Sequence, residues 1–385
     1  MGNRGIISVD DHLVEPPDVF HGRLPAAMAD RAPRVVVAGD GTEAWDIDGR
    51  LHPQIGLNAV AGRPKDEWSM DPANFSDMRR GCWDPSARLD DMDTDGVWAS
   101  VSFPSLVAGF AGATFARMDD PALGRECVRA WNDWHLEAWC AAAPDRLVPL
   151  QVPWLLDPQW TAAEVRRNAD RGFRVLSMPE QPVDIGLPSL HTGHWDPVLA
   201  ACQETGTVVA LHCASSGWSA SRSPDAPLEL LTTLFPVNAL VACADWLWSG
   251  VPARFPGLRI VLAESGIDWV PMLLNRIDYV MDHSASGLSA WPHPDHHPTE
   301  VLRRNFWFGV IDLTDVLALR HHIGLSNIVL ETDFPHADST WPESSQRADA
   351  ALAGLPPSEA DAIRFANAAE LLDWPLPPRA AGEPG

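Results

Sequence analysis

The sequence predicts an α/β fold, a (β/α)8 TIM barrel. First, short apolar runs typical of buried parallel strands alternate with stretches in which apolar residues recur three or four positions apart. Second, three of these runs end in potential metal ligands, namely Asp10 with His12, His212, and Asp333. Functional residues at the C-terminal ends of separate strands are typical of such barrels. Third, 46% of the 385 residues are hydrophobic, which supports one large core.

The expected strands are apolar runs bounded by turn residues. They cover residues 6–9, 97–103, 147–152, 173–178, 207–211, 258–263, 306–311 and 328–330. Amphipathic helices are expected at residues 121–143, 161–171, 195–205, 268–281 and 314–323. Eight strands that alternate with helices favour right-handed connections and a closed barrel. An open, doubly wound sheet is the alternative, although no Gly-x-Gly-x-x-Gly follows the first strand.

Two insertions interrupt the alternation. Residues 15–85, rich in Pro, Gly and Asp, are expected to form a cap-like segment after the first strand, with a small hairpin at 34–37 and 43–47. A smaller insertion at residues 284–298 precedes the seventh strand. We therefore expect a single domain over residues 1–375 and a flexible tail over residues 376–385.

Composition excludes several classes of function. The chain has 52 acidic and 28 basic side chains, a net charge of −24, which argues against nucleic-acid binding and against attraction to anionic lipid. No apolar run approaches the roughly 20 residues needed to cross a bilayer, and no signal peptide is visible. The six cysteines form no Cys-x-x-Cys pair and are expected to be reduced, as in a cytoplasmic protein.

Four side chains form the candidate metal site. Asp10 and His12 are two positions apart, so on a strand they point to one face. His212 and Asp333 end the fifth and eighth runs. Each has an ordinary structural alternative, because an Asp can cap a turn or helix and a His after an apolar strand can be a hydrogen-bonded core residue. Their joint occurrence at three strand ends favours one divalent ion with an open coordination position.

Ordered motifs give this chain a family resemblance. They are Asp10-Asp11-His12, Leu211-His212, Glu264-Ser265-Gly266, and Thr332-Asp333-Phe334-Pro335-His336 followed by Trp341-Pro342. With them the chain resembles the amidohydrolase superfamily, in particular the family 2 branch related to aminocarboxymuconate-semialdehyde decarboxylase. The resemblance implies that Asp10, His12, His212 and Asp333 bind one divalent metal per subunit, zinc first, with manganese or magnesium as alternatives. It also implies a homodimer or a higher homo-oligomer.

The chain departs from the motifs of the decarboxylase prototype of this branch at two places that bear on the metal and on catalysis. The first strand carries Asp-x-His in place of His-x-His, and the place of a His-Gly-Gly motif after the sixth strand reads Glu264-Ser265-Gly266. A carboxylate ligand makes manganese or magnesium more credible beside zinc. The fourth strand ends without a Lys, in Met178-Pro179-Glu180, so a binuclear site bridged by a carboxylated Lys is not expected.

The leading functional hypothesis is a lyase that removes CO2 from an aromatic or conjugated carboxylic acid, with the metal as Lewis acid. Asp333 would shuttle the proton. Glu264 is the next acid, or else it accepts from a ring nitrogen of His212 or His12, and His336 would contact the substrate or hold its loop. The alternatives are a hydrolase that uses metal-bound water on a C–N, lactone or C–C bond, and a non-catalytic binding protein.

The substrate itself is expected to be a small carboxylic acid. Arg222, in the loop after the fifth strand, could pair with its carboxylate, although a solvated surface Arg is the alternative. Trp218 and Trp341 lie on expected loops and could stack on an aromatic ring.

Overall fold

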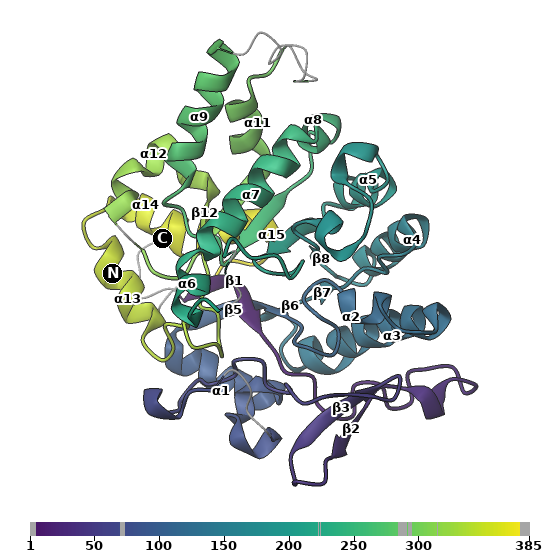
Figure 1. The fold of residues 1–385 in the computed structure, drawn as a ribbon. Helices are drawn as coiled ribbons and strands as arrows, with labels where there is room; N and C mark the ends of the chain where they lie inside the picture. Colours follow the sequence, from purple (N-terminus) through teal and green to yellow (C-terminus); the bar gives the residue numbers. More distant parts are fainter. Residues whose placement is uncertain are drawn as a thin grey trace.

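A computed structural model describes residues 5–69, 74–221, 223, 225–283, 291, 295–313 and 315–377. Its centre is a barrel of parallel strands surrounded by helices (Figure 1). The barrel strands are β1 (Ile6–His12), β5 (Val97–Phe103), β6 (Leu147–Val148) with β7 (Leu150–Gln151), β8 (Val175–Met178), β9 (Val208–His212), β10 (Ile260–Ala263), β11 (Phe306–Val310) and β12 (Ile328–Leu330). The predicted (β/α)8 fold is confirmed.

The strands pair in chain order around the barrel. β5 pairs with β1 and β6, and the strands from β7 to β12 pair successively in parallel register. The backbone closes the ring between the first and eighth strands, where Asp333 N–H donates to the Asp10 carbonyl at 3.0 Å and His12 N–H to the Phe334 carbonyl at 2.6 Å. The third strand was predicted as one run, but it is split at Pro149, which has no N–H for the ladder.

Helices cover the outside of the barrel, as the alternation predicted. They are α1 (Pro85–Asp95), α2 (Ala113–Ala116), α3 (Pro121–Trp134), α4 (Pro158–Ala169), α5 (Asp196–Thr205), α6 (Leu228–Thr233), α7 (Phe235–Trp248), α8 (Val251–Arg254), α9 (Val270–His283), α11 (Pro298–Asn305), α12 (Arg320–Ile323), α13 (Ser344–Leu352), α14 (Pro357–Asp361) and α15 (Asn367–Leu372). The helix expected at 121–143 changes to a wider π-helical turn at His135–Trp139. The predicted helix set lacked α7, whose apolar residues lie on all sides, so that no single-faced pattern marks it.

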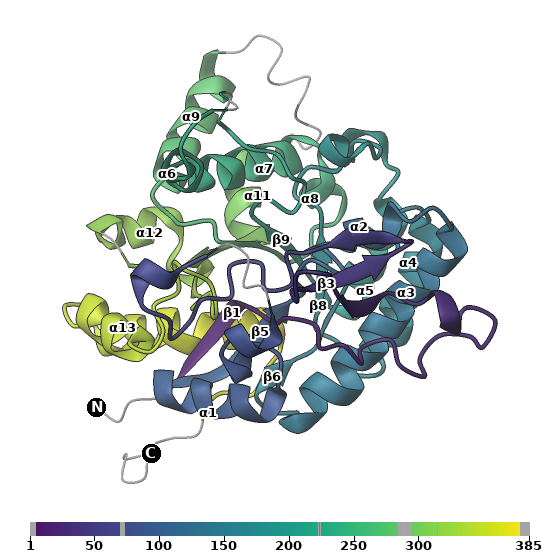
Figure 2. The same cartoon turned by 60° about the horizontal axis from the view of Figure 1, so that its bottom comes forward.

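The segment between β1 and α1 contains a small antiparallel sheet. The predicted hairpin is present as β2 (Arg34–Val37) and β3 (Glu43–Ile47), and β4 (Arg50–His52) extends it. Figures 1 and 2 show this sheet outside the barrel. Further along the segment, the N–H groups of Val60 and Ala61 donate to the Pro335 carbonyl, in the loop after β12. This segment therefore contacts the end of the barrel at which the strands terminate.

Other expectations concern the core, the membrane and the chain end. One hydrophobic cluster joins the inner faces of the helices to the strands, and all six cysteines are buried and unpaired. Among the described residues, no helix combines the length and the apolar character that crossing a bilayer requires. Most of the second expected insertion and of the expected tail lies outside the described residues.

Candidate metal centre

At the end of β1, the adjacent carboxylates of Asp10 and Asp11 point to opposite faces of the strand. Asp10 and His12 share one face, and Asp10 Oδ1 lies 3.5 Å from His12 Nε2. Asp11 points the other way and is held by hydrogen bonds from Thr332 Oγ1 at 2.5 Å, from Phe334 N–H at 3.2 Å and from the Ser100 hydroxyl. Strand alternation thus leaves Asp10 available as a ligand, while Asp11 joins β1 to β5 and to the segment after β12.

His212 is oriented by its own strand end. Its Nδ1 lies 2.6 Å from the Cys213 carbonyl, which can only accept, so Nδ1 carries the proton. The lone pair of Nε2 consequently faces the cluster, 3.4 Å from Asp10 Oδ2 and 3.1 Å from His12 Nε2. Fixing one ring nitrogen with a backbone carbonyl is how proteins present the other to a metal.

Asp333 approaches from the end of the eighth strand, which lies beside β1. It has a positive φ of 50°, which Asp tolerates better than most residues, and its Oδ1 lies 3.1 Å from His12 Nε2. Its backbone N–H is the donor that closes the ring at Asp10. The same contact that closes the barrel therefore brings the ligands of the first and eighth strands together.

The electrostatics of this cluster call for a cation. Asp10 and Asp333 are fully buried, and neither carboxylate oxygen of Asp10 has a hydrogen-bond partner. Burial, together with the carboxylates of Glu331 and Asp333, raises the pKa of Asp10 well above its usual range. Burial lowers the pKa values of His12 and His212, which favours the neutral rings that ligate metals. Buried carboxylates facing two neutral imidazoles fit a divalent ion.

Glu264 and His336 extend the cluster. Glu264 Oε1 lies 3.8 Å from His212 Nε2 and 3.6 Å from His336 Nδ1, and His336 Nδ1 lies 2.9 Å from Asp333 Oδ1. The potential ligand atoms form two overlapping groups, one with Asp10 and His212 and one with Asp333 and His336, and both include His12 and Glu264. Glu264 therefore lies at ligand distance rather than beside the outer nitrogen of His212, which Cys213 occupies.

His336 is held as a cation by its surroundings. Burial lowers its pKa, but the carboxylates of Asp333 and Glu264 outweigh that effect and raise the pKa to about 10. Its ring stacks on His12 with centroids 3.8 Å apart. A protonated imidazole between two carboxylates can exchange a proton with either of them.

The residues expected to contact the substrate do not form one cluster like the candidate metal ligands. Trp341 packs against Arg79 and donates to the Asp91 carbonyl at 3.3 Å, on the α1 side of the eighth loop. Trp218 is half-buried in the loop after β9, and its carbonyl accepts from Asn238 at 3.0 Å. Arg222 lies outside the described residues.

Sequence reasoning missed three further carboxyl groups near the cluster, and two of them, Glu331 and Glu180, are buried. Glu331 and the exposed Asp338 flank Asp333 in the chain, and Glu180 lies two residues after the end of β8. Burial raises the pKa of Glu180 to about 8. The signal for Glu331 was its place two residues before Asp333, because alternate residues at a strand end share a side.

Comparison with known proteins now defines the family. The amidohydrolase family profile matches residues 45–374, most of the chain. The chain belongs to the amidohydrolase family. The resemblance read from the motifs is thereby confirmed, and the (β/α)8 barrel agrees with it.

Individual amidohydrolase relatives are distant. A 2-amino-3-carboxymuconate-6-semialdehyde decarboxylase of Dictyostelium discoideum is 22% identical over 70% of this chain and 72% of its own length. An amidohydrolase structure from Mycobacterium avium subsp. paratuberculosis has a TM-score of 0.72 at 24% identity, covering 96% of this chain and 99% of its own. A 5-carboxyvanillate decarboxylase of Novosphingobium aromaticivorans, with bound manganese and 3-methoxy-4-hydroxy-5-nitrobenzoic acid, has a TM-score of 0.66 at 16% identity, covering 96% and 97%.

Proposed function

We propose that this amidohydrolase is a metal-dependent decarboxylase of an aromatic or conjugated carboxylic acid. The observation that carries the proposal is the buried cluster in which His12 and His212 face the carboxylates of Asp10 and Asp333. The decarboxylases among its relatives, one of them with manganese bound, support this reaction over others in the family.

The proposed ligands are Asp10, His12, His212 and Asp333, with Glu264 close enough to join them. A divalent ion held there would act as a Lewis acid, withdrawing charge from the substrate as the substrate's C–C bond breaks. Two imidazoles suit zinc and two carboxylates suit manganese or magnesium, so we propose one ion per chain drawn from these three.

Proton delivery is the task that falls to the protein side chains. When CO2 leaves, the electron pair of the broken C–C bond remains on the substrate carbon, which must take up one proton. We propose that Asp333 delivers this proton and that His336, 2.9 Å away, replaces it. Glu264 lies 3.6 Å from the same nitrogen of His336 and can return the proton to the imidazole.

The test begins with elemental analysis of the purified protein and a screen of aromatic acids for CO2 release. In D2O, decarboxylation should place one deuterium on the carbon that lost the carboxyl group. In ¹⁸O-labelled water, no label should enter the organic product. Label in the product with no CO2 released would refute the decarboxylase and establish the hydrolase that the family also admits.

The matched variants are Asp333→Asn and Asp373→Asn. Both aspartates have a positive φ near 50°, but Asp373 is exposed at the end of α15. Asp333→Asn should abolish turnover while the fold persists, whereas Asp373→Asn should leave turnover unchanged. Unchanged turnover in Asp333→Asn would refute the assigned proton donor, and a protein that binds no divalent metal would refute the proposal as a whole.

Three further expectations from the sequence remain proposals. They are a homodimer, a cytoplasmic location, and a single domain with a cap-like segment at residues 15–85. Sedimentation equilibrium of the purified protein tests the first, cell fractionation the second and limited proteolysis the third.

A further inference from the structure

A cavity of about 190 Å³ lies beside the proposed metal centre, at the C-terminal ends of β10, β11 and β12. Glu264 lines it and also contacts His212 and His336, so the cavity and the centre share a wall. Carboxyl groups dominate the polar part of the lining, which comprises Glu264, Asp268, Asp312, Glu331 and Asp338. Within the part of the chain that the structure describes, no Lys, Arg or His lines it.

Among the carboxyl groups that line the cavity, Glu331 is buried and incompletely hydrogen-bonded. It is 2% exposed, its Oε2 accepts from Glu264 N–H at 3.2 Å, and its Oε1 has no hydrogen-bond partner. The neighbouring strand leaves room for this carboxylate, because a Cβ on Gly309 would lie 1.9 Å from Oε2. A positive group that reaches a buried carboxylate oxygen without a donor stabilises it.

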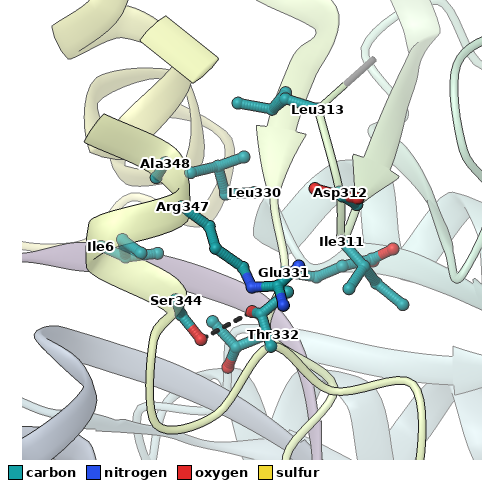
Figure 3. Close-up of a pocket in the computed structure, with 11 residues that line it drawn as sticks. Ile6, Ile311, Asp312, Leu313, Leu330, Glu331, Thr332, Ser344, Arg347 and Ala348 are labelled. Carbon is teal, nitrogen blue, oxygen red and sulfur yellow. Dashed lines mark hydrogen bonds between the residues drawn. The ribbon is translucent and has the colours of Figure 1, made fainter. Parts of the chain in front are cut away.

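Arg347, a basic side chain on the other side of β12, does not form an ion pair with Glu331. Figure 3 shows the small pocket on the far side of Glu331, where Arg347 extends from α13 toward the ends of β11 and β12. Arg347 is half-exposed, and its ion pair is with Glu343, at 3.7 Å. Glu331 Oε1 remains unpartnered in this arrangement.

We propose that the cavity binds a positively charged organic group of the substrate, an ammonium or amidinium group. The proposal rests on the proposed function only in taking the cavity as part of the substrate site. It implies that the substrate joins an acidic carboxyl group, directed to the metal, to a basic nitrogen that lies against Glu331.

An organic cation fits the lining better than a second metal ion. A metal needs several oxygen atoms converging at about 2.0–2.6 Å. Among the described residues, both convergent groups of ligand atoms contain His12, and neither contains Glu331, Asp268, Asp312 or Asp338. The remaining wall is apolar, formed by Phe235, Pro236, Val310 and Ile311, and suits the hydrocarbon part of an amine.

The test is direct binding of two small probes to the manganese-loaded full chain, measured by calorimetry. Benzylammonium and benzyl alcohol have similar shapes, differ in charge and lack a carboxylate, so neither can be decarboxylated. We expect the wild type to bind benzylammonium about tenfold or more tightly than benzyl alcohol. Glu331→Gln should remove this preference and Asp312→Asn should reduce it, whereas Glu343→Gln, on the exposed start of α13, should preserve it.

Equal affinity for the two probes in the wild type would overturn the proposal. So would a preference that survives Glu331→Gln in a variant whose circular dichroism matches the wild type. Should Glu331→Gln not fold, an unchanged preference in Asp312→Asn overturns the proposal and a reduced one supports it. A second bound Mn²⁺ that benzylammonium displaces would also overturn it, in favour of an inorganic cation. Loss of CO2 release with the probe preference intact would refute the proposed reaction and leave this site standing.

Discussion

Asp10→Asn is expected to have opposite effects on the metal-free and metal-loaded protein. Asp10 is fully buried, accepts no hydrogen bond through its side chain and faces further carboxylates. Without a metal, Asn removes an unfavourable buried charge and should stabilise the fold by on the order of 1–2 kcal/mol. With a metal, removing one partner from a buried charged cluster should cost about 3–5 kcal/mol, or about 10²- to 10⁴-fold in affinity.

Asp11→Asn is the matched control, because the two aspartates are adjacent and equally buried. Asp11 accepts hydrogen bonds from Ser8, Ser100, Thr332 and the Phe334 N–H. An amide cannot accept all of these, so Asp11→Asn should destabilise both forms by about 1–3 kcal/mol and leave metal affinity unchanged.

The assay combines urea unfolding of chelator-treated and manganese-loaded protein with competition against a chelator for the dissociation constant. The metal contributes to stability in proportion to the logarithm of its concentration over that constant, so the two measurements check each other. The reasoning is refuted if metal-free Asp10→Asn is less stable than the wild type. It is also refuted if both variants lose the same metal affinity.

Three further predictions concern the metal, a buried histidine and a glycine. Removing the metal with a chelator should lower the melting temperature, and Mn²⁺ should restore it, as calorimetry can measure. Burial lowers the pKa of His135 to about 3, so its contribution to stability is present above the unfolded value of 6.5 and is lost as pH falls. His135→Phe should therefore lose about 2 kcal/mol less than the wild type between pH 7 and pH 5 in urea titrations. Gly309→Ala should cost about 1–3 kcal/mol by displacing Glu331, whereas Gly354→Ala, with open space around it, should stay within about 0.5 kcal/mol, and equal effects would contradict this packing argument.

The sequence predicted those parts of the fold that depend on local patterns of residues. The strands at Val97–Phe103 and Ile328–Leu330 and the hairpin strands Arg34–Val37 and Glu43–Ile47 match their predicted bounds. Apolar runs and alternation are local properties, so they can be read directly. The split at Pro149 and the π-helical turn at His135 depend on how neighbouring elements pack, and the sequence pattern did not show them.

In the candidate site, too, local patterns predicted some features and the tertiary fold determined others. That Asp10 and His12 share a face follows from strand alternation alone, and the structure brings both toward His212 and Asp333. Trp341, expected near a substrate ring, contacts Arg79 in the structure, and its role toward a substrate stays a prediction. A loop aromatic has no periodicity to fix its direction, so its partner depends on the tertiary fold.

The sequence by itself determined the barrel and the strand ends that carry the proposed ligands, because both follow from short-range periodicity. Only the tertiary structure decided which acidic side chains lie next to one another and next to the histidines. The Thr332 N–H donates to the Ser8 hydroxyl across 324 residues of chain, and that closure places Asp333 beside His12. It also decided that Glu331 enters a space left by Gly309 on the neighbouring strand. Contacts of this kind depend on barrel closure and strand register, which no local stretch of sequence specifies.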